Sequence, residues 1–132
     1  MNNLLPLAHL EVKFILDGKT YEAETFKISF SQPKDFKGQP QHEVTGGQFM
    51  IGLTQIADKG LYVWARTPTM TKNGEILFQT DLGMTVYRIE FNNAYCITLT
   101  RDIDASVGTK TLLMIAPEQL FLNGIEHYNF WS

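Results

Sequence analysis

The residue types that most often bind metals or act in catalysis are scattered along this 132-residue chain. Its three histidines, His9, His42 and His127, belong to separate stretches of the sequence, far from one another and from the single cysteine, Cys96. Zinc and other transition metals usually take histidine and cysteine ligands at short, regular spacing. The spacing here provides no such motif, so we predict no metal site.

One acidic stretch is similar to the start of a calcium-binding loop, in which carboxylate oxygens are the ligands. Asp102, Asp104 and Ser106 would occupy its first, third and fifth positions. The glycine required at the sixth position comes instead at the seventh, Gly108, and the twelfth position is Leu113 where a bidentate glutamate is needed. We therefore exclude a calcium loop of this kind.

The remaining candidates for chemistry have structural interpretations. Gly46-Gly47 is not followed by the Lys-Ser/Thr pair of a phosphate-binding loop, and we interpret it as a bend or a close approach of the backbone. Cys96 falls on the polar face of a predicted strand with no basic neighbour, so we interpret it as a small packing residue. Because no two carboxylates form an acid–base couple in an apolar setting, the sequence predicts neither an enzyme nor a cofactor. It favours binding or assembly.

The elements that position these residues are strands, and the longest is expected over residues 85–101. Apolar and polar side chains alternate along it, which is the period of a strand with one buried and one wet face. The expected buried face holds Tyr87, Ile89, Phe91, Tyr95, Ile97 and Leu99; the expected wet face holds Arg88, Glu90, Asn92, Thr98 and Thr100. Such a strand exceeds the usual five or six residues, so we expect a bend or bulge at Asn92-Asn93.

Shorter alternating stretches surround it, bounded by turn residues. Asp17-Gly18 and Asn123-Gly124 are hairpin signals, Lys72-Asn73-Gly74 is expected to be a turn, and a change of parity near Glu24-Thr25 predicts a β-bulge. The expected strands cover residues 8–17, 19–31, 48–55, 75–82, 109–116, 118–122 and 125–131, and one helix is expected within 56–67, capped by Asp58 and ended by Pro68. This pattern predicts a mainly β fold, an antiparallel β-barrel of roughly seven or eight strands with one short α-helix on its side.

Composition places further bounds on the chain. The length fits a single domain over residues 1–132, with residues 1–7 as an N-terminal extension. A net charge of −3 argues against a nucleic-acid binder, and no apolar run reaches the ~20 residues of a membrane helix. The opening MNNLLPLAHLEV has no basic region and is not typical of a signal peptide, while a single cysteine fits a reducing compartment.

Two stretches are unusual for a plain barrel. Residues 31–47 form a polar, glycine- and proline-rich segment that is long for a loop and contains Phe36, which either folds back on its own barrel or docks on another surface. Leu112, Leu113, Met114 and Ile115 are apolar on both faces of their strand. One side would face the barrel interior, and the other would meet either the helix or a neighbouring subunit.

A series of short motifs runs in order through nearly the whole chain and carries a family resemblance. It consists of Phe30-Ser31-Gln32-Pro33-x-Asp35, Gly38-x-Pro40, Gly46-Gly47, Leu61-x-x-Trp64, Lys72-Asn73-Gly74, Asn93-Ala94-Tyr95-Cys96 and Gly124-x-Glu126-His127-x-x-x-Trp131. Together these motifs resemble the Hcp (TssD) tube proteins of the bacterial type VI secretion system, in particular the short Hcp-like branch.

The resemblance implies six copies closing into a ring, rings stacking into a hollow tube, kinship with phage tail-tube proteins, and a contractile sheath that expels the tube. Sheath and spike proteins, and effector proteins in the lumen, would then be partners, with no nucleic acid and no membrane insertion. The subunit would be made in the bacterial cytoplasm and exported through the apparatus without a cleaved signal peptide. In this family the loop between the second and third strands reaches the next ring, which here implicates Gln32, Pro33, Lys34, Asp35, Phe36 and Lys37.

Two surfaces of the strands become candidates under this hypothesis. The Leu112–Ile115 stretch would contribute to a subunit interface, and the wet face Arg88, Glu90, Asn92, Thr98 and Thr100 would suit a water-filled lumen as well as it suits plain solvent. The apolar start of the chain and the apolar Leu112–Ile115 stretch depart from the main tube subunit and leave room for a diverged paralogue. The alternative function is a stand-alone, lipocalin-like barrel that binds a small apolar ligand, which the crowded interior positions disfavour.

Overall fold

The computed structural model describes residues 9–30, 46–122 and 125–128, which form eight strands and one helix. In chain order these elements are β1 Glu11–Leu16, β2 Lys19–Phe30, β3 Gly46–Leu53, α1 Lys59–Arg66, β4 Lys72–Gln79, β5 Thr85–Asp104, β6 Gly108–Ala116, β7 Gln119–Leu122 and β8 Ile125–Tyr128. Every strand pairing is antiparallel.

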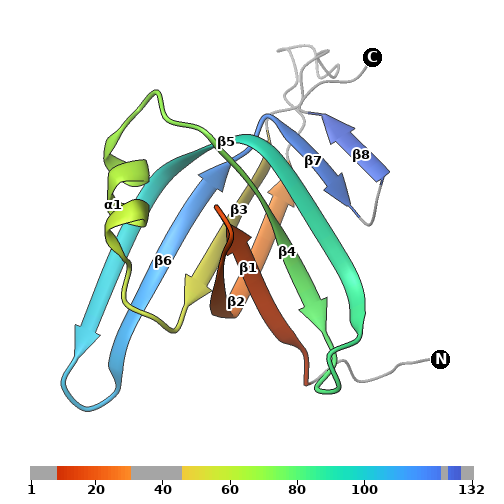
Figure 1. Ribbon diagram of the computed structural model, residues 1–132. Helices are drawn as coiled ribbons and strands as arrows, with labels where there is room; N and C mark the ends of the chain where they lie inside the picture. Colours follow the sequence, from red (N-terminus) through yellow and green to blue (C-terminus); the bar gives the residue numbers. More distant parts are fainter. Residues whose placement is uncertain (1–8, 31–45, 123–124, 129–132) are drawn as a thin grey trace, which may run out of the picture.

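The sheet closes on itself and so confirms the predicted barrel. Its strand order is β4-β1-β2-β3-β6-β5-β7-β8, and β4 also pairs with β5, so the first six strands form a ring. β7 and β8 continue from the edge of β5 outside that ring, as Figure 1 shows on the side opposite α1. The closed ring leaves a single interior, in which Phe91 lies between Phe14 and Phe49 at ring-centroid distances of 6.0 and 5.3 Å.

The turn chemistry that the sequence predicted is present at the β1–β2 hairpin and at the bulge of β2. Asp17 and Gly18 both have positive φ, as a tight hairpin of this type requires. The β2–β3 register shifts between Ala23 and Thr25, which confirms the predicted bulge and bends β2. The expected turn at Lys72–Gly74 is wrong, because these residues start β4. Gly74 is needed there, since a Cβ atom would come within 2.5 Å of the Ile15 carbonyl oxygen.

β5 bends where it was expected to bend, but the consequence for its two faces was not foreseen. Asn93 adopts a positive φ of 52°, and a second register shift follows between Cys96 and Thr98. Each irregularity moves the following side chains to the other face of the strand. Ala94 and Cys96 therefore lie in the core, whereas Tyr95 and Ile97, predicted to be buried, are 45% and 50% exposed.

The helix lies beside the ring and packs mainly against β5 (Figure 1). Asp58 caps it, as predicted, by accepting a hydrogen bond from the Leu61 backbone N–H. Leu61 and Trp64 are buried in the core, and the Trp64 Nε1–H donates to the Ala94 carbonyl at 3.1 Å. The helix thus covers β5 beyond its bend, where β4 no longer pairs with it.

Candidate assembly surfaces

The five polar positions predicted on the wet face of β5 do lie on its outward face, but the bend divides them. Arg88, Glu90 and Asn92 precede it, and Thr98 and Thr100 follow it. Before the bend, the Arg88 guanidinium bridges Glu75 at 2.8 Å and Glu90 at 2.9 Å, so this part of the face is a network of exposed charges over β4 and β5. After the bend the face has no comparable ion-pair network among the described residues.

Beyond the bend, Thr98 and Thr100 belong to a continuous outward surface of four strands, β2, β3, β6 and β5. The backbone register aligns one cross-strand row of side chains, Lys27, Met50, Met114 and Thr98, and a second row, Thr25, Gly52, Leu112 and Thr100. Polar side chains at both margins therefore flank apolar ones in the middle. The alternation of each strand did not predict this surface, because it depends on which strands are neighbours.

The apolar stretch of β6 is divided between the two faces of the sheet. Leu113 and Ile115 are fully buried in the core, so these two residues cannot contact a neighbouring subunit in the folded barrel. Leu112 and Met114 point outward and are partly exposed. The helix does not cover the outer side of β6, because it packs mainly against β5. Only Leu112 and Met114 therefore remain available as interface residues.

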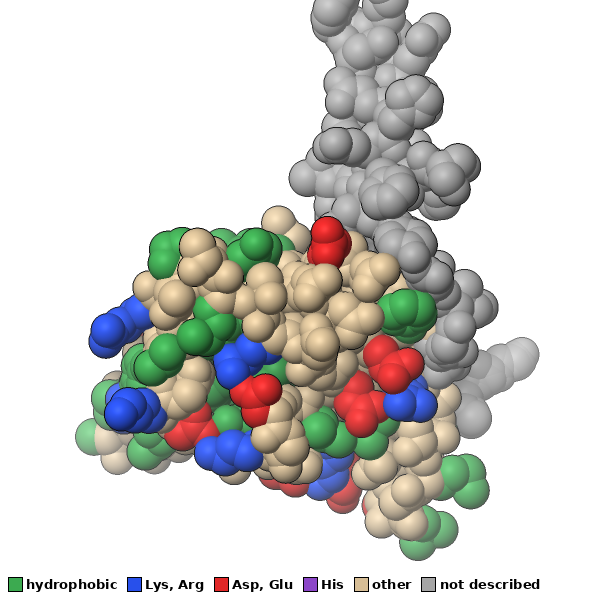
Figure 2. Space-filling view, turned by 45° about the horizontal axis from the view of Figure 1, so that its top comes forward, with side chains coloured by type: hydrophobic (Ala, Val, Ile, Leu, Met, Phe, Trp, Pro, Cys, Tyr) green, Lys and Arg blue, Asp and Glu red, His purple; other side chains and the backbone are tan. Residues whose placement is uncertain are grey.

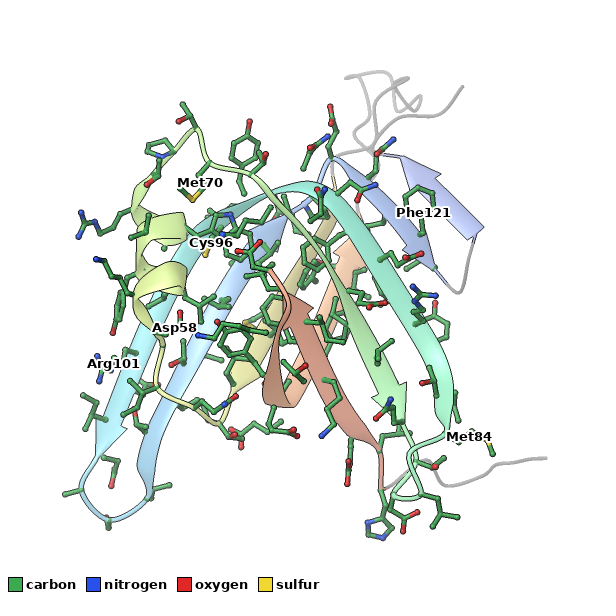
Figure 3. The ribbon with its side chains drawn as sticks, viewed as in Figure 1. Asp58, Met70, Met84, Cys96, Arg101 and Phe121 are labelled. Atoms are coloured by element: carbon green, nitrogen blue, oxygen red, sulfur yellow. The ribbon has the colours of Figure 1, made fainter. Side chains whose placement is uncertain are left out.

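Two hairpin ends carry large apolar side chains into solvent. In the β4–β5 turn Leu82 is 91% exposed, and Met84 points away from the barrel (Figure 3). In the β5–β6 turn Val107 is 86% exposed and Ile103, just before it, is 73% exposed. Single exposed apolar residues are common on proteins, but apolar residues gathered at rigid turns often mark contact surfaces. The sequence signal for them was the presence of Leu82, Met84 and Val107 in turns otherwise built from polar residues.

The position of the helix is fixed electrostatically through Asp58, which Figure 3 shows at the start of α1. Its carboxylate accepts hydrogen bonds from the Lys19 ammonium at 2.5 Å, the Tyr21 hydroxyl at 2.6 Å and the Leu61 N–H at 3.0 Å. Burial alone would raise the pKa of Asp58, but these donors outweigh it and lower the pKa to about 2. Burial, together with the Asp58 carboxylate, raises the pKa of Tyr21. This is the chemistry of a structural anchor.

Two features of the described residues bear on metal binding and on the reactivity of the cysteine. They contain no group of three or more His, Cys, Asp or Glu side chains arranged to hold a metal ion. Cys96 is buried, and burial raises the pKa of its thiol to about 11, which leaves it protonated and unreactive at neutral pH. Its predicted role as a packing residue holds, although it lies on the core face of β5 and not on the polar face. No described helix has the length and apolarity needed to cross a membrane.

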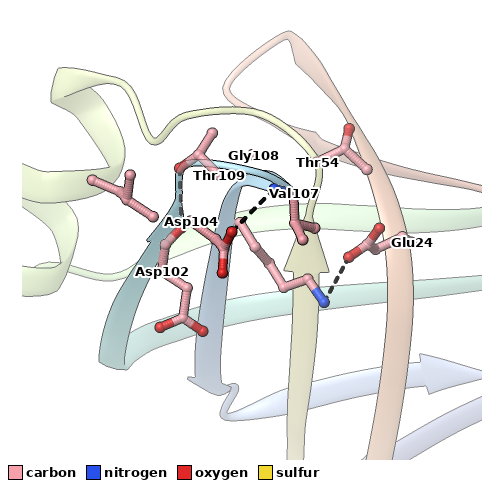
Figure 4. Close-up of a pocket in the computed structure, with 9 residues that line it drawn as sticks. Glu24, Thr54, Asp102, Asp104, Val107, Gly108 and Thr109 are labelled. Carbon is pink, nitrogen blue, oxygen red and sulfur yellow. Dashed lines mark hydrogen bonds and ion pairs between the residues drawn. The ribbon is translucent and has the colours of Figure 1, made fainter.

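A cavity of about 640 Å³ opens beside the end of the β5–β6 hairpin (Figure 4). Its walls come from β2, the end of β3 and both strands of the hairpin: Glu24, Thr54, Asp102, Ile103, Asp104, Val107, Gly108, Thr109 and Lys110. Within it Lys110 and Glu24 form an ion pair at 2.9 Å. The sequence indicated none of this, because the residues come from three separate stretches of the chain.

The predicted stacking segment Gln32–Lys37 lies outside the described residues. What the structure does give is the position of the strands on either side of it. Phe30 of β2 pairs with Gly46 of β3, so the segment leaves and re-enters the barrel at one end of the β2–β3 hairpin. The other end of the same hairpin, at Ala23 and Leu53, is the end next to the cavity.

On the face seen in Figure 2, acidic and basic side chains are interspersed, with apolar side chains between them.

The interior of the barrel is filled by aromatic and aliphatic side chains, twelve of which are less than 2% exposed: Trp64, Phe14, Phe49, Phe91, Ile51, Leu53, Leu61, Ile76, Ile89, Leu113, Ile115 and Leu120. An interior packed in this way leaves the lipocalin-like alternative without a ligand cavity among the described residues, so that function is not favoured.

Comparisons with known proteins agree with this architecture. The family model described as hemolysin coregulated protein Hcp (TssD) matches residues 8–132. No curated protein matches the sequence. The fold is similar to the structure of Hcp1 from Flavobacterium johnsoniae, with 22% identity, a TM-score of 0.78, and coverage of 90% of this chain and 99% of that one.

Two further structures share the fold at lower identity. Hcp1 from Salmonella typhimurium is 7% identical, with a TM-score of 0.71 and coverage of 85% of this chain and 84% of that one. A chain in the PVC sheath/tube terminator of an extracellular contractile injection system is 13% identical, with a TM-score of 0.65 and coverage of 92% and 98%. At these identities each likeness is one of fold alone.

Proposed function

The chain belongs to the TssD family, hemolysin coregulated protein Hcp, and on this premise we propose that it is a structural tube subunit of a type VI secretion system. The observation that carries the proposal is the family match over residues 8–132 together with a closed barrel that exposes large apolar side chains at two of its hairpin ends. Six copies form a ring, and rings stack into a hollow tube that carries no enzymatic activity of its own.

Unpaired strand edges support lateral assembly. Among the described strands, β8 pairs only with β7; the part of β5 beyond residue 94 pairs only with β6, and α1 covers part of its other side. Open edges invite pairing with other chains, and a closed ring of identical copies removes that hazard with one repeated interface. Leu112 and Met114 are the members of the Leu112–Ile115 stretch that we assign to such contacts, because they face outward.

The lumen face remains a proposal for the outward side of β5. Thr98 and Thr100 suit it best, because they form the polar margin of the four-strand surface, next to the apolar Leu112 and Met114 that we assign to subunit contacts. Arg88, Glu90 and Asn92 lie on the other side of the bend, over β4 and β7. The tube would then be loaded in the bacterial cytoplasm with effector proteins, and a sheath and a spike would complete the expelled assembly.

The mass of the native particle tests the proposed function most directly. We expect native mass spectrometry to find a species of six times 15.0 kDa, and electron microscopy to show annular particles. A protein that stays strictly monomeric at high micromolar concentration would overturn the tube-subunit proposal.

The segment Gln32–Lys37 is proposed as the ring-stacking contact, and Phe36→Asp tests it. A charge in place of the only aromatic residue of this segment should leave rings intact, because every residue of the described strands is unchanged, and should abolish their stacking into tubes. Phe36→Tyr is the matched control and should still stack. If Phe36→Asp forms tubes as readily as the parent, the stacking role is wrong.

A further inference from the structure

A second cavity, of about 470 Å³, lies at the bend of β5, and we call it the bend cleft. Three segments form its walls: the α1–β4 connection with Thr69 and Thr71, the bend of β5 with Asn93 and Tyr95, and the β6–β7 turn with Pro117 and Glu118. Figure 1 shows these segments together at the end of the barrel opposite the β5–β6 turn. Small-molecule sites commonly measure about 300–1,000 Å³, so the bend cleft is large enough to hold a small ligand.

Hydrogen bonds fix two walls of the bend cleft in place. The Asn93 N–H donates to the Asn73 Oδ1 at 2.8 Å, and the Asn93 Nδ2 donates to a Glu118 carboxylate oxygen at 2.8 Å. The Glu118 N–H lies 3.1 Å from the Asn92 carbonyl oxygen and 3.2 Å from that of Asn93. The β6–β7 turn is therefore joined directly to the bend of β5. A site that is already formed spends little binding free energy on ordering its walls.

Polar groups on both sides of the bend cleft are available to a ligand. On the α1–β4 side, Met70 packs against the core, while Thr69 and Thr71 beside it are exposed. Neither threonine hydroxyl is hydrogen-bonded to another described residue, so each can donate and accept. On the β5 side, the Asn93 nitrogen binds Glu118, which leaves the amide oxygen of Asn93 as an acceptor.

Tyr95 provides the one aromatic ring among the described residues that line the bend cleft. It is 45% exposed, and it makes no hydrogen bond or ring contact with another described residue. Tyrosine combines an apolar ring face with a polar edge. It is therefore suited to a ligand that is apolar on one face and polar around its rim. Sugar rings have this character, because C–H groups cover their faces and hydroxyl groups surround them.

The charges of the bend cleft narrow the class of ligand further. The described residues that line it include no lysine and no arginine, so no cationic side chain is present to bind a phosphate or a carboxylate. Its one carboxylate, Glu118, already accepts a hydrogen bond from Asn93. A carboxylate has about four acceptor sites, so Glu118 can still accept hydrogen bonds from ligand hydroxyls. These properties favour a neutral ligand rich in hydroxyl groups.

We propose that the bend cleft binds a neutral saccharide. One face of a sugar ring packs against Tyr95, and the sugar hydroxyls bond to Thr69, Thr71 and Glu118. This inference goes beyond the proposed tube function, because it assigns the subunit a ligand and a site that require no second copy of the chain.

Saturation-transfer NMR on the full chain tests the proposal, with maltose, cellobiose and N,N′-diacetylchitobiose as probes. We expect saturable binding of at least one of these disaccharides, with a dissociation constant of about 10 mM or tighter. The C–H protons of one sugar face should receive the strongest transfer, because that face lies on the Tyr95 ring. The proposal is overturned if none of the three disaccharides binds saturably.

Substitutions then locate the site. Tyr95→Ala should weaken binding at least about tenfold, whereas Tyr95→Phe keeps the ring and should bind within about twofold of the parent. Leu82→Ala is the control, because it shortens a side chain that is 91% exposed and lies outside the bend cleft. Thr71→Val, which removes one hydroxyl at nearly constant volume, should weaken binding about fivefold and tests the site independently of Tyr95. Unchanged affinity in Tyr95→Ala and Thr71→Val would place the saccharide elsewhere and overturn the proposal.

Two further probes distinguish a saccharide from other ligands that an aromatic ring can bind. Glu118→Gln removes the charge but keeps an acceptor, so disaccharide affinity should change less than about threefold. Tetramethylammonium, a cation suited to an aromatic ring beside a carboxylate, should bind more weakly than the disaccharide. Adenosine, whose flat base stacks on aromatic rings, should also bind more weakly. If either probe binds more tightly than every disaccharide, the site is not one for saccharides.

Discussion

The two halves of β5 differ in how they are paired and in which of their side chains are exposed. Before Asn93 the strand pairs with β4 on one edge and β7 on the other, and its own residues Ile89 and Phe91 are buried in the core. Beyond Ala94 it pairs with β6 alone, and Tyr95, Ile97 and Ile103 are exposed. The first half is completed within the chain, whereas the second half leaves surface for other copies.

The difference arises from backbone irregularities and not from amino-acid composition. Both halves alternate apolar and polar residues in the sequence. The positive φ at Asn93 and the register shift after Cys96 change which members of the second half face the core. A strand can therefore be apolar along its whole length and still direct some of its apolar side chains outward.

The largest effect is expected in the first half of β5. Phe91→Ala removes a fully buried ring that contacts Phe14 and Phe49, so we expect the free energy of unfolding to fall by about 4 kcal/mol. Chemical denaturation followed by circular dichroism measures this change. A loss below about 1 kcal/mol would mean that the first half does not carry the core.

An intermediate effect is expected at the anchor that holds α1 against the second half. Asp58→Asn removes the carboxylate that binds Lys19 and Tyr21 but keeps an N-cap, and we expect a loss of about 1–2 kcal/mol near neutral pH. Hydrogen exchange should increase more at residues 94–101 than at residues 86–91, because Trp64 binds the Ala94 carbonyl.

The pH dependence of the free energy of unfolding tests whether the ionised Asp58 carboxylate is the group that stabilises the helix position. The pKa of Asp58 is lower in the folded chain than the ordinary value of 3.8, so the unfolded state binds this proton more readily. The stabilisation by Asp58 is therefore complete above about pH 4 and is lost as the pH falls toward 2. Unfolding free energies of the parent and of Asp58→Asn should converge over that range. If the difference in unfolding free energy between the parent and Asp58→Asn stays constant from pH 7 to pH 2, the ionised carboxylate does not provide the stabilisation.

The smallest effect on folding is expected on the exposed side of the second half. Ile97→Lys changes a side chain that is 50% exposed, so the free energy of unfolding should change by less than about 0.5 kcal/mol. Ring formation, in contrast, should weaken, because a charge would be buried beside the open edge of β5. Sedimentation velocity measures this change, and Ile97→Val is the control. Normal rings in Ile97→Lys would remove this side of β5 from the subunit interface.

Much of the architecture could be predicted from local patterns. The alternation of β1 and β2, the Asp17-Gly18 turn, the bulge near Thr25 and the Asp58 cap each depend on residues close together in sequence. The barrel followed from the number of half-buried strands. The prediction was wrong at Lys72–Gly74, where residues typical of a turn begin a strand. Gly74 occurs there because a side chain would clash with the Ile15 carbonyl oxygen of the neighbouring strand.

The candidate surfaces were less predictable. The outward rows across β2, β3, β6 and β5 and the cavity beside Val107 combine residues from distant stretches, so no local pattern reveals them. Strand geometry predicted that Leu112–Ile115 would divide into two buried and two outward residues. It did not predict that the helix leaves the outer side of Leu112 and Met114 uncovered.

The amino-acid sequence by itself determined the strands, their turns and a family resemblance, because hydrophobic period and turn chemistry are properties of neighbouring residues. Only the tertiary structure decided which side chains beyond Asn93 face outward and where the cavities lie. The reason is physical: the positive φ of Asn93 inverts the faces of the strand until the register shift after Cys96 restores them, and strand order, which places Glu24 beside Lys110, is set by long-range pairing.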